Sequence, residues 1–278
     1  MSGRDSFRPY RETRFATTDR KRAVSAQQTP RQNHLLAALP LGDYERLLLD
    51  LEPVALPRGW TVHHAGDRQT YLYFLTAGIV SWFYVTLNGA SAEFAVMGRE
   101  GVIGVASFLG GESTPSQEVV VSAGCAYRLG ADLLKNEFEH NRPLRRLLLR
   151  YTQALIAQTA QIAVCNRHHS LEQQLCRWIL SNLDRLASNE LAMTQELIAD
   201  MLGVRRERVT EAAGKLQKAG LIQYSRGHIA VLDRSELEAQ VCECYAVVKR
   251  EYDRLLRSED SIGNAGVHGA RRQYGTGW

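Results

Sequence analysis

The spacing of apolar residues changes along the chain. Over residues 33–51, leucines and alanines recur every three or four positions, with a break at Pro40-Leu41-Gly42. Over residues 53–129 the pattern becomes short β-rich runs separated by glycines. These patterns predict two short helices followed by a small barrel, roll or sandwich. The expected strands are 60–64, 71–75, 79–85, 92–97 and 118–129.

A longer helical pattern covers residues 143–165. One stripe of this predicted helix is apolar, and arginines and glutamines occupy the opposite face. Such a stripe is buried either on its own domain or against a second copy in a coiled coil. The stripe contains Leu144, Leu147, Leu148, Tyr151, Leu155, Ile156, Thr159, Ile162 and Ala163.

The most specific pattern lies at residues 194–216. Thr194 is a suitable N-cap for a short helix over 195–202, and Gly203 can end that helix in a left-handed conformation. A second helix is expected over 205–219. A helix-turn-helix needs a small residue at the crossing, a glycine in the turn and apolar residues facing inward. Those positions are Ala199, Gly203 and Val209, with Ile198, Leu202, Val204 and Ala212.

The second helix begins with Arg205-Arg206-Glu207-Arg208. In the major groove of DNA, arginine can bind O6 and N7 of guanine, and glutamate can accept from N4 of cytosine. We predict that Arg206 and Glu207 read bases, and that Arg205 and Arg208 contact phosphates. A solvated helix face with arginine–glutamate pairs is the alternative.

A hairpin follows, with strands over 219–224 and 229–232 and a turn over 225–228. This hairpin is the predicted wing, and Arg226 and His228 at its tip are expected to contact phosphates. The complete set of predicted DNA contacts is Thr194, Gln195, Arg205, Arg206, Glu207, Arg208, Thr210, Glu211, Lys215, Arg226 and His228.

Over residues 33–233, this order of elements resembles the Crp/Fnr family of bacterial transcription regulators, and GVRRERVTEAAGKLQKAGLI is similar to the family's recognition helix. The resemblance implies an α+β fold: an N-terminal cyclic-nucleotide-binding-like β-roll, a long dimerisation helix and a C-terminal winged helix-turn-helix. The implied partners are double-stranded DNA, a second copy of the chain and RNA polymerase. The family's base-reading Arg-Glu pair falls on Arg206-Glu207, whereas Glu211 stands where the family often has arginine, which argues for a different half-site.

The expected organisation has a disordered basic tail over 1–31, a β-roll sensor over 32–142 and a dimerisation helix over 143–166. A winged helix-turn-helix domain with a C-terminal helix then covers 167–257, and a disordered tail covers 258–278. The capping-box pattern Ser170-Leu171-Glu172-Gln173 opens the DNA-binding domain.

The effector motif of the roll is degenerate. Relatives that bind cyclic nucleotides have a Gly-Glu pair followed about ten residues later by Arg-Ser or Arg-Thr, and the arginine pairs with the phosphate. Gly104 and Ser116 fit this pattern, but Val105 replaces the glutamate and Pro115 the arginine. Because a buried phosphate without a cation is strongly disfavoured, cyclic AMP is not expected, and the effector and any cofactor are unknown.

Charge and cysteine content add little to this picture. A net charge of +4 and a pI of about 8.8 permit nucleic-acid binding if the cations share one surface. Five scattered cysteines, with no signal peptide or membrane span, indicate a reduced cytoplasmic protein without a membrane partner. Cys242 and Cys244 are expected on a helix that points them apart into the core, and the spacing of Cys165, His168 and His169 does not support a metal site. No metal ligands are predicted.

Two other function classes remain open. A cupin-like metal-dependent enzyme domain fused to a DNA-binding domain would need two histidines and a carboxylate on neighbouring strands, and the roll offers only His63-His64. An interaction module that no longer binds DNA would not need the arginine-rich helix. Because no catalytic triad or phosphate-binding loop occurs at usable spacing, no catalytic residues are predicted and the chain is not expected to be an enzyme.

Overall fold

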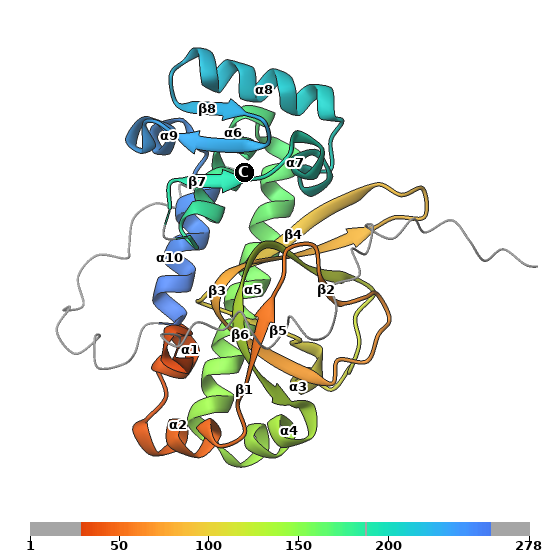
Figure 1. Ribbon diagram of the computed structural model, residues 1–278, viewed down its shortest axis with the longest axis vertical. Coiled ribbons are helices and arrows are strands. Elements are labelled where there is room, and N and C mark those ends of the chain that lie inside the picture. Colours follow the sequence, from red (N-terminus) through yellow and green to blue (C-terminus); the bar gives the residue numbers. More distant parts are fainter. Residues whose placement is uncertain (1–28, 187, 257–278) are drawn as a thin grey trace, which may run out of the picture.

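The computed structural model describes residues 29–186 and 188–256. A β-roll lies at one end of the molecule and a helical domain with a small sheet at the other, and the long helix α5 (Arg142–His168) runs between them (Figure 1). This α+β architecture is the predicted one. The tails predicted for 1–31 and 258–278 lie outside the described residues, except that 29–31 are described and Pro30–Gln32 form a 3₁₀ helix.

Two short helices, α1 (His34–Ala37) and α2 (Leu41–Leu48), precede the roll, as the interrupted leucine pattern predicts. Asn33 fixes the first of them. Its side-chain oxygen accepts the N–H groups of Leu35 and Leu36, and its amide nitrogen donates to the carbonyl oxygens of Leu75 and Gly101. The helix is thereby anchored to the roll.

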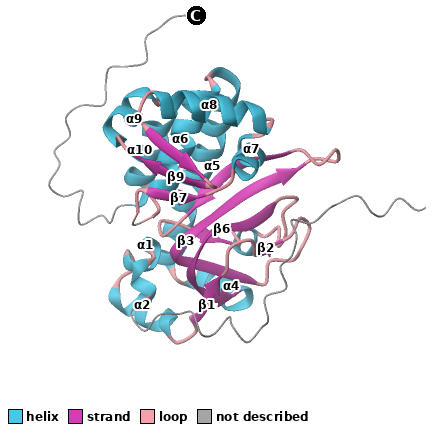
Figure 2. Ribbon diagram, turned by 45° about the horizontal axis from the view of Figure 1, so that its top comes forward, coloured by secondary structure: helices cyan, strands magenta, loops and turns pink. Residues whose placement is uncertain are grey.

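The roll is one antiparallel sheet in the order β1-β6-β3-β4, with β2 added to β6 and β5 to β3. Figure 2 shows how the long strands curve around one another. The strands are β1 (Glu52–Leu56), β2 (Thr61–His63), β3 (Tyr71–Val85), β4 (Ser91–Met97), β5 (Val102–Ile103) and β6 (Gln117–Gly130). The short helix α3 (Ala106–Leu109) follows β5, and α4 (Ala131–His140) follows β6.

The expected break between strands at 71–75 and 79–85 was wrong, because β3 continues through Gly78. Gly78 has a φ of +88°, and a Cβ there would lie 2.7 Å from the Ser122 carbonyl oxygen. At the same crossing a Cβ on Gly124 would lie 2.0 Å from the Ala77 carbonyl oxygen. The glycines permit a close, bulged crossing of β3 and β6 and do not end the strand.

The second half of the chain begins with α6 (Leu171–Leu183), whose N-terminus carries the predicted capping box between Ser170 and Gln173. A small antiparallel sheet in the order β7-β9-β8 follows, with α7 and α8 inserted after its first strand. These elements are β7 (Glu190–Ala192), α7 (Gln195–Leu202), α8 (Arg206–Lys218), β8 (Ile222–Ser225) and β9 (His228–Val231), followed by α9 (Arg234–Gln240) and α10 (Cys244–Leu256).

The C-terminal helix α10 lies along α5 (Figure 1). Tyr252 packs edge-on against Tyr151 and donates its hydroxyl to Gln158 at 3.2 Å. Because α10 begins at Cys244, Cys242 precedes the helix. The prediction that both cysteines lie on one helix and point apart was therefore wrong.

The two halves of the chain share a hydrophobic core. Ile79, Val96 and Val119 of the roll pack in one buried cluster with Leu175 and Ile179 of α6. A second buried hydrophobic cluster fills the roll and includes the face of α5 that packs against the roll. Among the described residues, no helix combines the length and apolar character that a membrane crossing requires.

Candidate nucleic-acid interface

The turn between α7 and α8 has the geometry expected from the sequence. The Thr194 hydroxyl caps α7 by accepting the N–H of Leu197 at 3.2 Å. Gly203 ends the helix with φ 67° and ψ 34°, a left-handed conformation that costs glycine little. The positions predicted to face inward are buried, apart from Gly203 and the partly buried Val204: Ile198, Ala199, Leu202, Val209 and Ala212.

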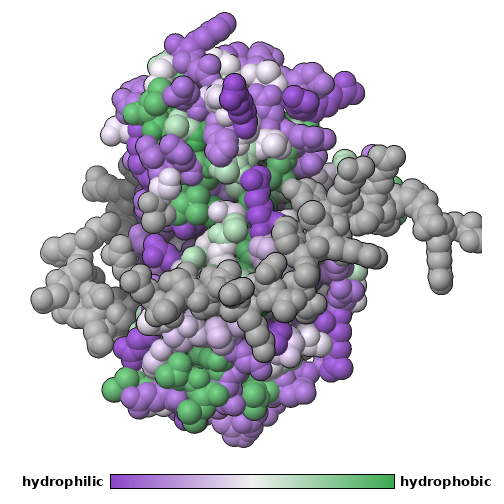
Figure 3. Space-filling view, viewed as in Figure 1, coloured by the Kyte–Doolittle hydropathy of each residue, from purple (hydrophilic) through white to green (hydrophobic). Residues whose placement is uncertain are grey.

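The first turn of α8 presents a run of charge to solvent. The helix starts at Arg206, one residue later than expected, and Arg205 is its N-cap. The side chains of Arg205, Arg206, Glu207 and Arg208 are all exposed. Figure 3 shows a largely hydrophilic surface at the end of the molecule that α8 occupies. This surface can meet an anionic or polar partner without burying apolar groups.

Thr210 connects the two helices of the motif. Its hydroxyl lies 2.7 Å from the Gln195 side-chain oxygen and 3.1 Å from the carbonyl oxygen of Arg206. This contact holds the start of α7 beside the first turn of α8. Thr194, Gln195 and Arg206 consequently face one pocket.

The wing is a tight hairpin formed by β8 and β9. Arg226 and Gly227 are its two turn residues, with φ values of 50° and 79°. Positive φ at both positions is the signature of a type I′ turn, which matches the twist of the paired strands. The Tyr224 hydroxyl donates to the Met193 carbonyl oxygen at 2.9 Å and ties the wing to the segment before α7.

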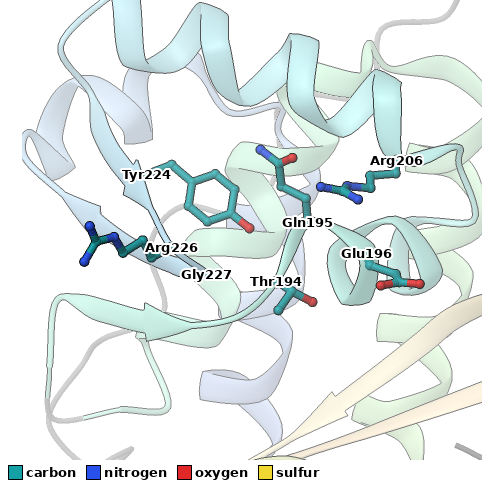
Figure 4. A pocket seen from close by; sticks show the side chains of 7 residues that line it. All are labelled: Thr194, Gln195, Glu196, Arg206, Tyr224, Arg226 and Gly227. Atoms are coloured by element: carbon teal, nitrogen blue, oxygen red, sulfur yellow. The ribbon is translucent and has the colours of Figure 1, made fainter.

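A pocket of about 430 Å³ lies between these elements (Figure 4). The Arg206 side chain comes from α8, and Arg226 comes from the wing on the opposite side. Glu196 and Tyr224 also line the pocket, and sequence reasoning did not identify them. The strand pattern and the wing turn could have pointed to Tyr224. The lining consists of Thr194, Gln195, Glu196, Arg206, Tyr224, Arg226 and Gly227.

The remaining predicted contacts lie outside this pocket. Lys215 is held by two carboxylates, with Glu172 at 2.6 Å and Glu211 at 3.0 Å. Hydrogen bonding to Glu172 raises the pKa of Lys215, so this amine stays charged. Any phosphate contact by Lys215 competes with these pairs. His228 is exposed on β9 beside the turn. Arg205, Glu207 and Arg208 are exposed at the start of α8 but do not line the pocket.

In the roll, Gly104 and Ser116 are enclosed by the protein. Ser116 is 2% exposed and accepts the indole N–H of Trp82 at 2.5 Å. Gly104 has a φ of +95°, and its N–H donates to the Glu118 carboxylate at 3.3 Å. Glu118 is fully buried and lies 2.5 Å from the Nδ1 atom of His63.

A second backbone donor of this loop is also satisfied internally. The Ala106 N–H donates to the Gln69 side-chain oxygen at 2.9 Å. The N–H groups of Gly104 and Ala106 are therefore engaged by side chains of the protein. His63 is buried, whereas the neighbouring His64 is exposed.

Four side chains from distant parts of the sequence could hold a metal ion. Cys165, His169, Cys242 and Cys244 present ligand atoms that all lie within 4.8 Å of one another. Sequence reasoning did not bring these residues together, because no spacing pattern connects the end of α5 with the segment before α10.

Two family models match the chain. One describes a cyclic nucleotide-binding domain and matches residues 53–141, and the other describes a Crp-like helix-turn-helix domain and matches residues 173–240. The first covers the roll, and the second covers the segment that contains α7, α8 and the wing.

Curated relatives are similar over most of the chain. A CRP-like cAMP-activated global transcriptional regulator of Mycobacterium tuberculosis (strain ATCC 25618 / H37Rv) is 22% identical over 198 residues, which are 69% of this chain and 88% of that protein. The global nitrogen regulator of Synechococcus elongatus is 22% identical over 202 residues, 69% of this chain and 90% of its own.

Solved structures share the fold. FixK2 from Bradyrhizobium japonicum has a TM-score of 0.61 at 17% identity and covers 69% of this chain and 98% of its own. A crp/fnr-family transcriptional regulator from Eubacterium rectale has a TM-score of 0.61 at 18% identity and covers 74% and 96% of the two chains.

Proposed function

The chain belongs to the Crp/Fnr family of transcription regulators, and we propose that it binds a pseudo-palindromic DNA operator as a homodimer. The regulator function is favoured over a cupin-like enzyme because both family models and the curated relatives describe regulators or their domains.

The observation that carries the proposal is the pairing of α8 with the wing across the pocket in Figure 4. Exposed Arg206 and Glu207 stand at the N-terminal end of α8, which is the end that reaches base edges in this motif. Arg226 lines the edge of the same pocket at the tip of the wing, where its exposed side chain is available to a phosphate. The contacts assigned to phosphate or to positioning are Thr194, Gln195, Arg205, Arg208, Thr210, Lys215, Arg226 and His228, while Glu211 is the residue expected to alter the half-site.

The dimer proposal rests on a second face of α5. The apolar stripe identified from the sequence is mostly buried within the chain, and its member Ile156 is 65% exposed. Exposed positions recur on this second face at alternating spacings of four and three: Leu149, Gln153, Ile156, Ala160, Ala163 and Arg167. That spacing is the heptad of a coiled-coil seam, so two α5 helices can pair through it. Two copies so paired would present two recognition helices, and hence a two-fold site.

Selection of bound duplexes from a random DNA pool tests the proposal. The full chain is expected to enrich a two-fold sequence with half-sites about one helical turn apart. Enrichment of a single unpaired half-site would overturn the dimer. No enrichment over bulk competitor DNA, with or without added small molecules, would overturn sequence-specific binding.

We propose further that the roll does not bind cyclic AMP. The Glu118 carboxylate already accepts the Gly104 N–H, and Gln69 accepts that of Ala106. A phosphate entering here would meet a buried carboxylate in place of a cation. Cyclic AMP is therefore expected to leave the melting temperature of the protein unchanged, because only a ligand that binds the folded state raises it. A rise that saturates with cyclic AMP would contradict this proposal.

A further inference from the structure

The strongest feature outside the DNA-binding surface is the sulfur-rich cluster at the junction of the two halves. Cys165 lies in the last turn of α5, and His169 is the residue that caps that helix. Cys242 lies in the connection between α9 and α10, and Cys244 is the first residue of α10. The three cysteines are buried, whereas His169 is partly buried.

The distances within this cluster fit a tetrahedral metal site. The sulfur atoms of Cys165 and Cys242 are 3.6 Å apart, and the Cys244 sulfur lies 3.4 Å from Nδ1 of His169. Around a tetrahedral Zn²⁺, bonds of about 2.3 Å to sulfur and about 2.0 Å to nitrogen separate two sulfurs by about 3.8 Å and sulfur from nitrogen by about 3.5 Å. We propose that Cys165, His169, Cys242 and Cys244 form a structural Zn²⁺ site.

The surroundings of the four ligands support a metal site. The Nε of Arg177 donates to the Cys165 sulfur at 3.2 Å, and the Gln161 amide donates to the Cys244 sulfur at 3.0 Å. The Nε2 atom of His169 lies 3.4 Å from a Glu243 carboxylate oxygen. Ligating histidines commonly donate their second N–H to a carboxylate, and this bond fixes the ring so that Nδ1 faces the metal.

Charge balance agrees with this assignment. Three thiolates, a neutral histidine and Zn²⁺ carry a net charge of −1. The guanidinium of Arg177, which is only 5% exposed, lies against this group and offers the compensating positive charge. A buried ion pair of this kind needs close contact between its members, which the 3.2 Å hydrogen bond supplies.

A disulfide is the competing use of the cluster. It would require the sulfurs of Cys165 and Cys242 to move from 3.6 Å to about 2.05 Å, and both cysteines are free thiols in the structure. A Cys165–Cys242 disulfide would also leave Cys244 and His169 unused, although their ligand atoms lie within 4.8 Å of those two sulfurs. The geometry of all four residues therefore favours a metal.

A bound metal would connect the last turn of α5 to the start of α10. One ligand, His169, lies two residues before Leu171, where α6 begins. The helix-turn-helix follows α6, so the metal would help to set how the DNA-binding half sits on α5. This consequence rests on the proposed function. With zinc bound, the spacing of two recognition helices in a dimer would be defined, and zinc removal would weaken binding to the two-fold site.

The direct test is the metal content of the full-length protein, purified under reducing conditions and measured by inductively coupled plasma mass spectrometry. We expect about one zinc per chain. Cys242→Ser and His169→Ala should lose most of it, whereas the matched controls Cys125→Ala and Cys176→Ala, which change buried cysteines outside the cluster, should keep it. Equal zinc content in wild type and both cluster variants would overturn the proposal.

A second measurement does not depend on how well the variants fold. Wild-type protein stripped with a chelator and reloaded with Co²⁺ should show cobalt–thiolate charge-transfer absorption and the visible bands of a tetrahedral ion. Absence of metal together with a Cys165–Cys242 disulfide in mass spectra of the native protein would overturn the site. Zinc binding without any DNA preference would refute the proposed function and leave the site intact, and DNA preference without metal would do the reverse.

Discussion

Charged side chains in this protein occupy two contrasting environments. Arg206 is exposed at the start of α8, so water solvates it until a partner arrives. Glu93 is buried on β4, 4% exposed, with the Ser81 hydroxyl donating to it at 2.5 Å. Burial raises the pKa of Glu93 to about 7, and the nearby guanidinium groups of Arg177 and Arg185 only partly oppose this rise.

For Arg206, we expect the substitution Arg206→Ala to weaken binding to the selected operator by about 1–3 kcal/mol and to relax sequence preference at one base pair. The reason is the loss of a bidentate contact with a base edge. Fluorescence anisotropy on the operator and on single-base variants measures both effects. Arg250→Ala, which removes an exposed arginine of α10, is the matched control. An equal loss on every sequence would make Arg206 a phosphate contact.

For Glu93, the stability of the protein should fall as pH rises. In the unfolded chain the carboxyl ionises near its ordinary pKa of 4.5, whereas in the folded chain it keeps its proton until about pH 7. Between these two pH values the unfolded state binds fewer protons than the folded state. The contribution of Glu93 to the free energy of unfolding therefore declines by about 3 kcal/mol as the pH rises. Glu93→Gln should remove this decline in urea unfolding at pH 5 to 8, and an unchanged slope would contradict the assignment.

At the level of elements, α5 has one buried apolar face and a second, exposed face that carries apolar residues. One face, including Leu148, Tyr151 and Leu155, is buried against the roll and α10. The other presents Leu149 at 48% exposure and Ile156 at 65%. This exposed leucine and isoleucine, one heptad apart, lie on the face through which we propose that two α5 helices pair.

Replacing Ile156 by glutamate should therefore shift the protein from dimer to monomer, since two like charges would face each other across the seam. Analytical ultracentrifugation measures the change. The affinity of the protein for the two-fold DNA site should fall as the dimer dissociates. The melting curve of the monomeric chain should change little. Leu133→Glu places the same charge on an exposed leucine of α4, which is 46% exposed, and should leave the dimer intact.

Across the whole molecule, the roll and the DNA-binding half are joined by direct polar contacts as well as by α5. Arg185, after α6, pairs with Glu100, which lies between β4 and β5, at 2.6 Å, and the two side chains are 10% and 17% exposed. Ser91 on β4 also donates to the carbonyl oxygen of Asp200 on α7 at 3.0 Å. The roll therefore contacts the DNA-binding half directly and not only through α5.

Glu100→Ala should destabilise the folded chain by about 1–3 kcal/mol, because it leaves the partly buried Arg185 without its carboxylate. Glu52 pairs with Arg128 at 2.7 Å but is 59% exposed, so Glu52→Ala is the matched surface control and should cost no more than about 1 kcal/mol. Urea unfolding measures both. Similar losses for the two variants would mean that the Glu100 pair contributes no more than a surface pair.

The sequence by itself determined the helix-turn-helix. The Thr194 cap, the left-handed Gly203 and the inward apolar positions interact within a few residues, and backbone preferences at that range do not depend on the rest of the chain. The same holds for the type of most strands in the roll and for the capping box at Ser170.

Tertiary structure decided what depends on partners far along the chain. β3 continues through Gly78 because β6 crosses it closely there. The face of α5 that is buried is the one that packs against the roll and α10. Cys165 and Cys242 are 77 positions apart, and only the packing of α10 on α5 brings their sulfurs to 3.6 Å. Local sequence patterns do not predict such long-range contacts. These contacts form only when folding buries surfaces from distant parts of the chain against one another.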